Sequence, residues 1–205
     1  MTSHQTEKKQ RKNIVICVCG MTASGKSTVA RRLAEKYKLR FYSGGDALKA
    51  LAIEAGYKPL TYGWWESEEG AKFLQQRLQN PEFDKKVDKK LLELAKMGNV
   101  VLDSWTMSWL FDGGFKIWID ASKKVRIKRL AKRDGISLRK ASDVLENKEE
   151  TTKTIYKKLY GFRLGEDFSP FDLILDTNKL NADEVLQAVS LVVDHVLLRK
   201  SSVNQ

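Results

Sequence analysis

The segment from Gly20 to Ser27 constrains this chain more than any other feature of its sequence. It has the spacing G-x-x-x-x-G-K-[ST], follows the apolar run at 14–18 and precedes an amphipathic segment that begins at Thr28. A strand, a glycine-rich loop and a helix in this order are the context in which this spacing forms a phosphate-binding loop. Glycine-rich turns also join strands to helices without binding a ligand. The intact spacing with both flanks nevertheless favours the phosphate-binding loop.

The residue types of this loop explain how it holds a polyphosphate. Glycines let the backbone curl so that several amide hydrogens point at phosphate oxygens. The N-terminus of the following helix adds unpaired amides and the positive end of its dipole. Lys26 reaches the terminal phosphates in such loops, and the hydroxyl of Ser27 ligates Mg²⁺. We therefore predict that the loop binds a nucleoside triphosphate.

Length and composition indicate one domain. The chain has 205 residues, of which 42% are hydrophobic and 31% charged, as in soluble globular proteins. Its apolar runs are shorter than the roughly 20 residues of a membrane span, and residues 1–13 lack the apolar core of a signal peptide. We expect a monomeric cytoplasmic protein with a disordered basic tail at 1–13, one domain at 14–198 and a frayed tail at 199–205.

The two cysteines and two histidines point away from disulfide or metal chemistry. Cys17 and Cys19 lie two apart on the first predicted strand, so they share a face and cannot easily pair with each other. We expect buried, reduced thiols that pack like small hydrophobic side chains. His4 lies in the tail and His195 near the last predicted helix, so no cluster of His and Cys metal ligands is expected.

Positive charge gathers in one part of the chain. The formal net charge is +11, and nine Lys or Arg but only one acid, Asp134, lie between Lys123 and Lys140. An enzyme that handles phosphates needs such density near its site, and an RNA-binding protein needs it on a broad face. A generally basic protein is the ordinary alternative. Charge alone does not separate these possibilities.

Apolar runs alternate with segments of helical periodicity along the chain. We predict strands at 14–18, 39–42, 100–103, 115–119 and 171–175, and helices at 28–38, 47–55, 67–78, 81–97, 122–134, 137–160 and 182–198. Asp46 is the expected N-cap of the second helix. This alternation implies a parallel sheet covered on both faces. Because ligands lie beyond the carboxyl ends of such strands, the phosphate-binding loop, the Ser43 turn and Asp103 should converge.

Asp103 is the predicted partner of the loop in metal binding. It ends a strand after Val-Val-Leu, which is the usual context of an acid that holds Mg²⁺ beside the loop Ser or Thr. The alternative is an aspartate that only caps a loop. The sequence lacks a Ser/His/Asp or Cys/His constellation for covalent catalysis. Phosphoryl transfer therefore fits better, since it depends on positioning and positive charge.

Several further motifs, taken together with this loop, resemble one family. They are Phe41-Tyr42-Ser43-Gly44-Gly45-Asp46, the segments 80–88 and 98–103, Ile136-Ser137, Lys148-Glu149-Glu150, Tyr156, Tyr160-Gly161 and the segment 171–174. In this order they resemble the nucleoside monophosphate kinases of the P-loop superfamily, closest to the archaeal-type cytidylate kinases, over about residues 13–198. The resemblance implies a three-layer α/β fold with a five-stranded parallel sheet. A helical acceptor-binding insertion at about 44–97 and a helical lid at about 134–165 are implied as well.

The resemblance also implies an activity, transfer of the terminal phosphoryl of ATP to a pyrimidine monophosphate, most simply CMP or dCMP, with Mg²⁺. It implies that the ATP phosphates are held by Gly20, Met21, Thr22, Ala23, Ser24, Gly25, Lys26, Ser27 and Thr28. Ser27 and Asp103 would hold the metal, and Lys26, Arg129 and Arg133 would stabilise the transferring phosphoryl group. The acceptor would contact Ser43, Asp46, Lys49, Asp84, Asp88 and Trp105. For Arg129 and Arg133, a solvated helix face is the alternative.

The acceptor side departs from the family pattern. Lysine, tryptophan or isoleucine stands about where such kinases carry arginine, at Lys49, Trp105, Lys148, Lys153 and Ile155. Lysine keeps the charge but loses the planar two-pronged grip on phosphate, and the other two keep neither. The donor side is therefore intact and the acceptor side altered.

Four tryptophans, at 64, 65, 105 and 109, lie in segments expected to face the acceptor. They either pack beneath loops or stack on a base, free or within RNA. Two alternatives to a CMP kinase remain open. One is the same chemistry on another acceptor, a different monophosphate or an RNA end. The other is a non-enzymatic RNA-binding protein gated by ATP.

Overall fold

The computed structural model describes residues 13–58 and 63–198. The predicted tails, apart from Asn13, and the part of the loop at 59–62 lie outside these residues. Five parallel strands form one sheet in the order β2-β3-β1-β4-β5. They are β1 (Val15–Cys19), β2 (Arg40–Ser43), β3 (Val100–Asp103), β4 (Phe115–Asp120) and β5 (Leu173–Asp176). The predicted five-stranded parallel sheet is confirmed.

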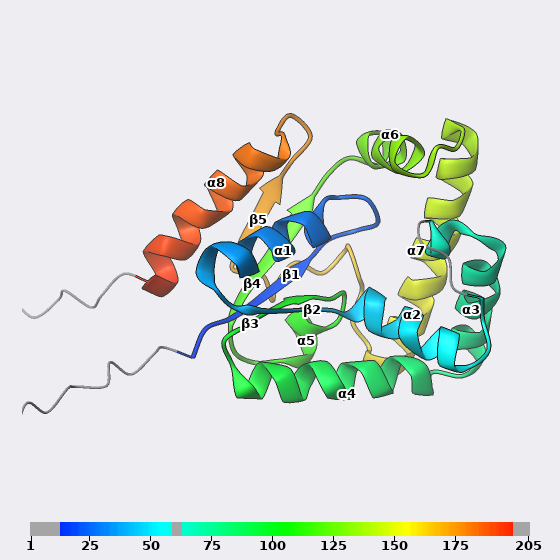
Figure 1. The fold of residues 1–205 in the computed structure, drawn as a ribbon, viewed down its shortest axis with the longest axis horizontal. Helices are drawn as coiled ribbons and strands as arrows, with labels where there is room; N and C mark the ends of the chain where they lie inside the picture. The colour runs from blue at the N-terminus through cyan, green and yellow to red at the C-terminus, as the bar shows by residue number, and fades with distance from the viewer. Residues whose placement is uncertain (1–12, 59–62, 199–205) are drawn as a thin grey trace, which may run out of the picture.

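Helices cover both faces of the sheet, which gives three layers (Figure 1). Ile16 and Val18 of β1 pack with α1 (Lys26–Tyr37) and α8 (Ala182–Val193). Val15 and Cys17, on the opposite face, pack with α4 (Glu82–Met97) and the short helix α5 (Met107–Leu110). Successive side chains of a strand point to opposite faces, and the continuous apolar run of β1 fills both cores.

Two groups of helices extend beyond the sheet (Figure 1). The first group follows β2 and precedes β3 in the chain, and it consists of α2 (Gly44–Glu54), the 3₁₀-helix η1 (Trp64–Glu66), α3 (Glu68–Gln79) and α4. The second group follows β4 and precedes β5 in the chain, and it consists of α6 (Lys123–Asp134) and α7 (Leu138–Tyr160). Helix α7 packs against both α6 and α3. The chain after β4 therefore meets the chain before β3 at one side of the sheet.

Some boundaries differ from the prediction. Ser43, not Asp46, is the N-cap of α2, because its Oγ accepts a hydrogen bond from the Asp46 amide at 3.2 Å and the helix begins at Gly44. Strand β5 begins at Leu173 rather than Phe171, whose ring packs against Trp109 and Trp118. The last predicted helix is α-helical only to Val193 and continues as a π-helical turn at Asp194–Leu198.

The cysteines behave as predicted. Cys17 and Cys19 are both buried and free. Burial raises the pKa of Cys17 to about 12, and it raises the pKa of Cys19 still further. Within residues 13–58 and 63–198, no helix has the length and apolar character that crossing a membrane requires.

Candidate functional site

The phosphate-binding loop follows the buried end of β1 and leads directly into α1. Gly20 has φ 152°, and a Cβ there would lie 2.4 Å from the carbonyl oxygen of Ile119 and 2.6 Å from Ser24 Oγ. Only glycine fits this close approach. Gly25, with φ 105°, turns the chain into α1. The two glycines of the motif thus have distinct roles, one in packing and one in backbone direction.

A buried ion pair fixes the middle of the loop from the outside. Glu149 of α7 accepts a hydrogen bond from the Thr22 amide at 2.9 Å and pairs with Arg126 of α6. Arg126 also donates to the carbonyl oxygens of Thr22, at 3.1 Å, and Ala121, at 3.0 Å. The loop backbone is therefore held by residues more than one hundred positions away in the sequence.

Arg129 supports the other end of the loop. Its guanidinium donates to the carbonyl oxygen of Ser24 at 2.9 Å and to the carbonyl oxygen of Thr177 at 2.7 Å. Arg129 is not among the residues that line the cavity described below. In this structure Arg129 binds backbone carbonyl groups. Its role at the transferring phosphoryl group stays a prediction.

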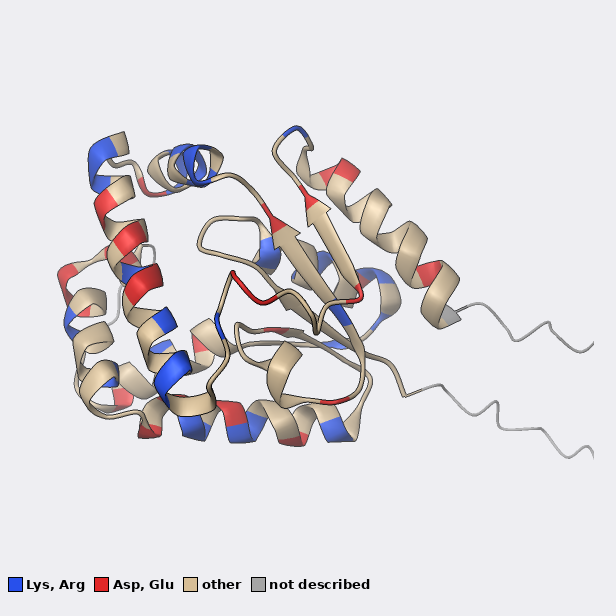
Figure 2. Cartoon of the chain, turned by 180° about the vertical axis from the view of Figure 1, so that it is seen from behind, with Lys and Arg blue, Asp and Glu red and all other residues tan. Residues whose placement is uncertain are grey.

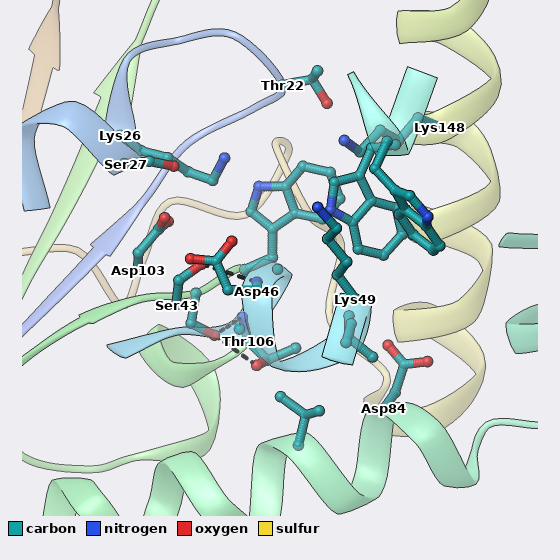
Figure 3. Close-up of a pocket in the computed structure, with 18 of the residues that line it drawn as sticks. Thr22, Lys26, Ser27, Ser43, Asp46, Lys49, Asp84, Asp103, Thr106 and Lys148 are labelled. Atoms are coloured by element: carbon teal, nitrogen blue, oxygen red, sulfur yellow. Dashed lines mark hydrogen bonds between the residues drawn. The ribbon is translucent and has the colours of Figure 1, made fainter. Parts of the chain in front are cut away.

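The register of the sheet brings Asp103 to the loop. Asp103 of β3 pairs with Val18 of β1 on one side and with Ser43 of β2 on the other. The side chains of Asp103, Ser27 and Lys26 lie on the same side of one cavity (Figure 3). The Oδ1 atom of Asp103 is buried and has no hydrogen-bond partner among the described residues. The convergence of the loop, the Ser43 turn and Asp103 is thus present in the structure.

These groups fit a magnesium site. In the part of the chain that the structure describes, no three His, Cys, Asp or Glu side chains gather as metal ligands. Mg²⁺ at phosphotransfer sites is bound by one or two protein oxygens, by substrate phosphates and by water, so such a cluster is not required. An unpaired, buried carboxylate oxygen is costly without a cation or donor. Ser27 and Asp103 are therefore suited to hold this ion.

The cavity has a volume of about 330 Å³ and runs from the loop to the helices between β2 and β3. Of the residues that the sequence predicts as ligands, it is lined by Thr22, Ala23, Lys26, Ser27, Ser43, Asp46, Lys49, Asp84, Asp88, Asp103, Trp105 and Arg133. The predicted residues Gly20, Met21, Ser24, Gly25 and Thr28 belong to the loop or its helix but not to this lining. The cavity thus joins donor-side and acceptor-side residues in one space.

Two buried carboxylates lie at the acceptor end of the cavity. Arg77 donates to both oxygens of Asp84, at 3.0 and 2.6 Å. Asp88 accepts from the hydroxyls of Thr106, at 2.6 Å, and Tyr160, at 2.7 Å. Burial raises the pKa of Asp88 to about 6, although these two hydrogen bonds oppose the rise. Asp84 has the counter-ion Arg77, whereas the hydrogen-bond partners of Asp88 in the described part of the chain are neutral hydroxyls.

A carboxylate and two cations lie opposite these acids. Glu66 of η1 pairs with Arg133 at 3.0 Å and with Lys148 of α7 at 3.5 Å. Lys148 Nζ lies 5.0 Å from the centroid of the Trp65 ring. Burial lowers the pKa of Lys148 to about 8, and Glu66 opposes this shift. The two cations line the cavity together with Lys26 and Lys49, so they can contact an anionic group of a ligand, although the lining also contains carboxylates.

The four tryptophans have different surroundings. Trp64 is buried against Phe73, and Trp109 stacks on Phe162 with ring centroids 4.2 Å apart. Trp65 is half-buried and lines the cavity. Trp105 also lines it, and its Nε1 donates to the carbonyl oxygen of Gly20 at 2.5 Å. Packing therefore accounts for Trp109, whereas Trp65 and Trp105 present surface to a ligand.

The altered acceptor positions also separate into two groups. Lys49, Trp105 and Lys148 line the cavity. Lys153 pairs with Glu150 on an exposed face, and the Ile155 side chain is buried in a cluster with Tyr156 and Leu74. The departures from arginine that can affect a ligand directly are thus the first three.

The sequence did not predict a role at the site for several residues that the structure places there. They are Glu66, Arg77, Thr106, Arg126, Glu149, Tyr156 and Tyr160. Glu149, Tyr156 and Tyr160 belong to motifs that carry the family resemblance, but their roles follow from contacts made across the chain. Arg126 is one of many basic residues on α6 (Figure 2), and only its burial distinguishes it. Burial within a charged helix is not readable from composition.

Cytidylate kinases are among the proteins to which this chain is similar in sequence. The model of the cytidylate kinase-like family matches residues 15–179. The cytidylate kinase of Pyrococcus horikoshii is 34% identical over 184 residues, which cover 89% of this chain and 90% of that protein. The cytidylate kinase of Methanocaldococcus jannaschii is 32% identical over 188 residues, covering 89% and 99%.

Solved structures agree on the fold. Shikimate kinase from Acinetobacter baumannii in complex with shikimate matches with a TM-score of 0.55 at 16% identity, covering 91% of this chain and 96% of that one. Shikimate kinase from Bacteroides thetaiotaomicron matches with a TM-score of 0.54 at 15% identity, covering 88% and 98%. At these identities the likeness concerns the fold alone. From the family match, the archaeal relatives and the P-loop geometry, this chain belongs to the cytidylate kinase-like family of nucleoside monophosphate kinases.

Proposed function

We propose that this protein transfers the γ-phosphoryl group of ATP to CMP or dCMP in the presence of Mg²⁺. The observation that carries the proposal is the single cavity that contains Lys26 and Ser27 of the loop, Asp103 of β3, and the acceptor-side residues Lys49 and Asp88. The relatives named as cytidylate kinases support the pyrimidine acceptor. Phosphoryl transfer needs this combination of donor and acceptor groups in one space.

In the proposed reaction, an oxygen of the acceptor phosphate forms a bond to the γ-phosphorus of ATP. The bond from that phosphorus to the β–γ bridging oxygen breaks, and ADP leaves. Lys26 lies where it can neutralise charge on the transferring group, and Arg133 and Lys148 face the same cavity. Ser27 and Asp103 are the residues that would hold Mg²⁺, which supplies further positive charge against the phosphate oxygens.

Asp88 is the better candidate for contact with the base. Each oxygen of Asp84 accepts a hydrogen bond from the Arg77 guanidinium, whose charge compensates that carboxylate, whereas the partners of Asp88 are neutral hydroxyls. Each oxygen of Asp88 accepts one hydroxyl hydrogen bond, and a carboxylate oxygen has capacity for a second. The exocyclic amine of cytosine is a donor, whereas uracil has an acceptor carbonyl at that position. Asp88 would therefore favour cytosine over uracil.

A screen of acceptors with labelled ATP tests the proposal. CMP, dCMP, UMP, AMP, GMP and short RNAs with free 5′ ends are each incubated with the protein, Mg²⁺ and ATP labelled at the γ-phosphate. We expect label on CMP and dCMP, and we expect Lys26→Ala to abolish it while circular dichroism stays unchanged. Transfer only to RNA ends would refute the acceptor. Phosphoryl transfer to a nucleotide by Lys26→Ala at the parental rate would refute the mechanism.

A further inference from the structure

Glu66 occupies a position at which three elements meet. It ends η1, and its side chain is only 6% exposed. One of its oxygens, Oε1, lies 3.0 Å from Nη2 of Arg133, in the last turn of α6, and 3.5 Å from Nζ of Lys148, in the middle of α7. A single carboxylate oxygen thus contacts a cation from each of the two helices that follow β4.

The charges around Lys148 make this contact important for its protonation. Glu66 faces it from η1, Arg133 from α6 and Lys26 from α1, and Arg133 is itself paired with Asp134 at 2.7 Å. Burial, Lys26 and Arg133 all lower the pKa of Lys148, and only Glu66 raises it. Its pKa of about 8 is close to neutral pH. Loss of Glu66 should therefore lower the pKa of Lys148 further and increase the fraction of Lys148 that is uncharged at neutral pH.

The contact between Glu66 and Lys148 is not an ordinary surface ion pair, whereas the Arg133 side chain is 55% exposed. Pairs of exposed charges contribute little and are screened by salt. The side chain of Lys148 is 17% exposed, and that of Glu66 is less so. All three charged groups line the cavity (Figure 3 labels Lys148). Asp134 offsets the charge of Arg133 from outside the lining, so the four charges sum to zero. The lining itself nevertheless receives two cations and one carboxylate from the cluster of Glu66, Arg133 and Lys148.

We infer that Glu66 is a positioning residue that presents Arg133 and Lys148 as one cationic unit to the phosphate of the acceptor and to the group being transferred. This inference rests on the proposed function. Glu66 itself does not touch the reacting atoms. It acts by keeping Lys148 charged and by holding the end of α6 against η1, where lysine and arginine then meet the substrate phosphates.

Three variants separate this role from simple packing. Glu66→Gln keeps the shape and removes the charge, Glu66→Asp keeps the charge, and Glu68→Gln is the matched control. Glu68 lies two residues away, pairs with Lys72 on the surface and does not line the cavity. Steady-state rates with CMP and ATP are measured from pH 6 to pH 9. The titration of Lys148 is followed in parallel by NMR of ¹³C-labelled lysine in the substrate-free protein, assigned with Lys148→Arg.

We expect Glu66→Gln to lower kcat about tenfold at pH 7, comparable to the loss of one charge-assisted hydrogen bond. The dissociation constant for ATP should stay close to the parental value. The alkaline limb of the pH profile and the NMR midpoint of Lys148 should both move to lower pH. Glu66→Asp should restore most of the rate, and Glu68→Gln should change nothing.

Other results overturn the inference. They are an unchanged or higher kcat in Glu66→Gln, a loss of equal size at every pH, or an unshifted Lys148 midpoint. Failure of the proposed function looks different, because then the parental protein transfers no phosphoryl group to any monophosphate. In that case the missing activity would refute the proposed function. A Glu66→Gln shift of the Lys148 midpoint would still support the coupling of Glu66 to Lys148.

Discussion

The donor side and the acceptor side of the cavity are built by different means. On the donor side, the backbone of the phosphate-binding loop forms the site, and the buried pair Arg126–Glu149 holds it from behind through hydrogen bonds to Thr22. On the acceptor side, side chains from η1, α2, α3, α4 and α7 form the wall, and the buried pair Arg77–Asp84 belongs to that wall. One side depends on backbone geometry and the other on which side chains are present.

This difference predicts where the chain should tolerate substitution. A backbone site fixes residue types at few positions, which is why the loop motif is intact. A wall of side chains can exchange arginine for lysine or tryptophan and keep its fold. Lys49, Trp105 and Lys148, which the family resemblance places about where arginine is expected, line the cavity. Substitutions on the donor side should therefore either abolish activity or leave it intact, whereas substitutions on the acceptor side should change activity by degrees.

The largest expected effect concerns the pair that holds the loop. Glu149→Gln leaves Arg126 charged and buried without its counter-ion, so the free energy of unfolding should fall by about 3–5 kcal/mol. The control is Glu150→Gln, which removes only an exposed pair with Lys153 and should cost less than about 1 kcal/mol. Urea denaturation measures both. Equal losses in the two variants would contradict the role of the buried pair.

The second effect concerns the metal. Asp103→Asn should lower the rate of phosphoryl transfer about 10²- to 10³-fold, similar to the loss of one group that stabilises transition-state charge. Asp120→Asn is the matched control, because Asp120 also ends a strand but does not line the cavity. Initial rates over a range of Mg²⁺ concentrations give the result. If Asp103→Asn keeps the parental dependence on Mg²⁺, Asp103 is only a structural residue.

The third effect is a dependence of stability on pH at the acceptor wall. Because the pKa of Asp88 is raised to about 6, the native state binds its proton more tightly than the unfolded state does. The contribution of Asp88 to stability is therefore most favourable at about pH 4 and is lost as the pH rises through about 6. From pH 4 to pH 7, the parental protein should lose about 2 kcal/mol relative to Asp88→Asn.

Denaturation of both proteins at several pH values measures this difference. Using the difference between the two proteins cancels the titration of the other acids. A constant difference across the range would show that Asp88 titrates like an exposed aspartate. The positive charge of Arg77, the partner of Asp84, would then outweigh the effect of burial on the pKa of Asp88.

The smallest effect tests the contact between the two sides. Trp105→Phe keeps an aromatic ring near Lys26 but loses the hydrogen bond to Gly20, worth about 1 kcal/mol. The dissociation constant for ATP should rise about fivefold, as measured by calorimetry. Trp109→Phe loses an indole hydrogen bond to Asp167, which is not among the lining residues, and should leave ATP binding unchanged. Similar losses in both variants would argue for packing alone.

Sequence-based prediction succeeded where the information was local. The loop spacing, the strand that precedes it and the acid at the end of β3 were all predicted, and the parallel register then placed Ser43 beside Asp103. It failed at the N-cap of α2, where Ser43 and Asp46 are both good capping residues. The Ser43 side chain accepts the hydrogen bond of the Asp46 amide. Which of the two residues caps the helix is decided only by the backbone geometry.

The amino-acid sequence by itself determined the order of strands and helices, the phosphate-binding loop and the family. These features reside in neighbouring residues and in periodicity, so short segments specify them. Only the tertiary structure decided that Glu149 holds Thr22, 127 positions away, and that Glu66 pairs with both Arg133 and Lys148. Such contacts join segments that are distant in the chain, and the charges of Glu149 and Glu66 matter because folding removes both carboxylates from water.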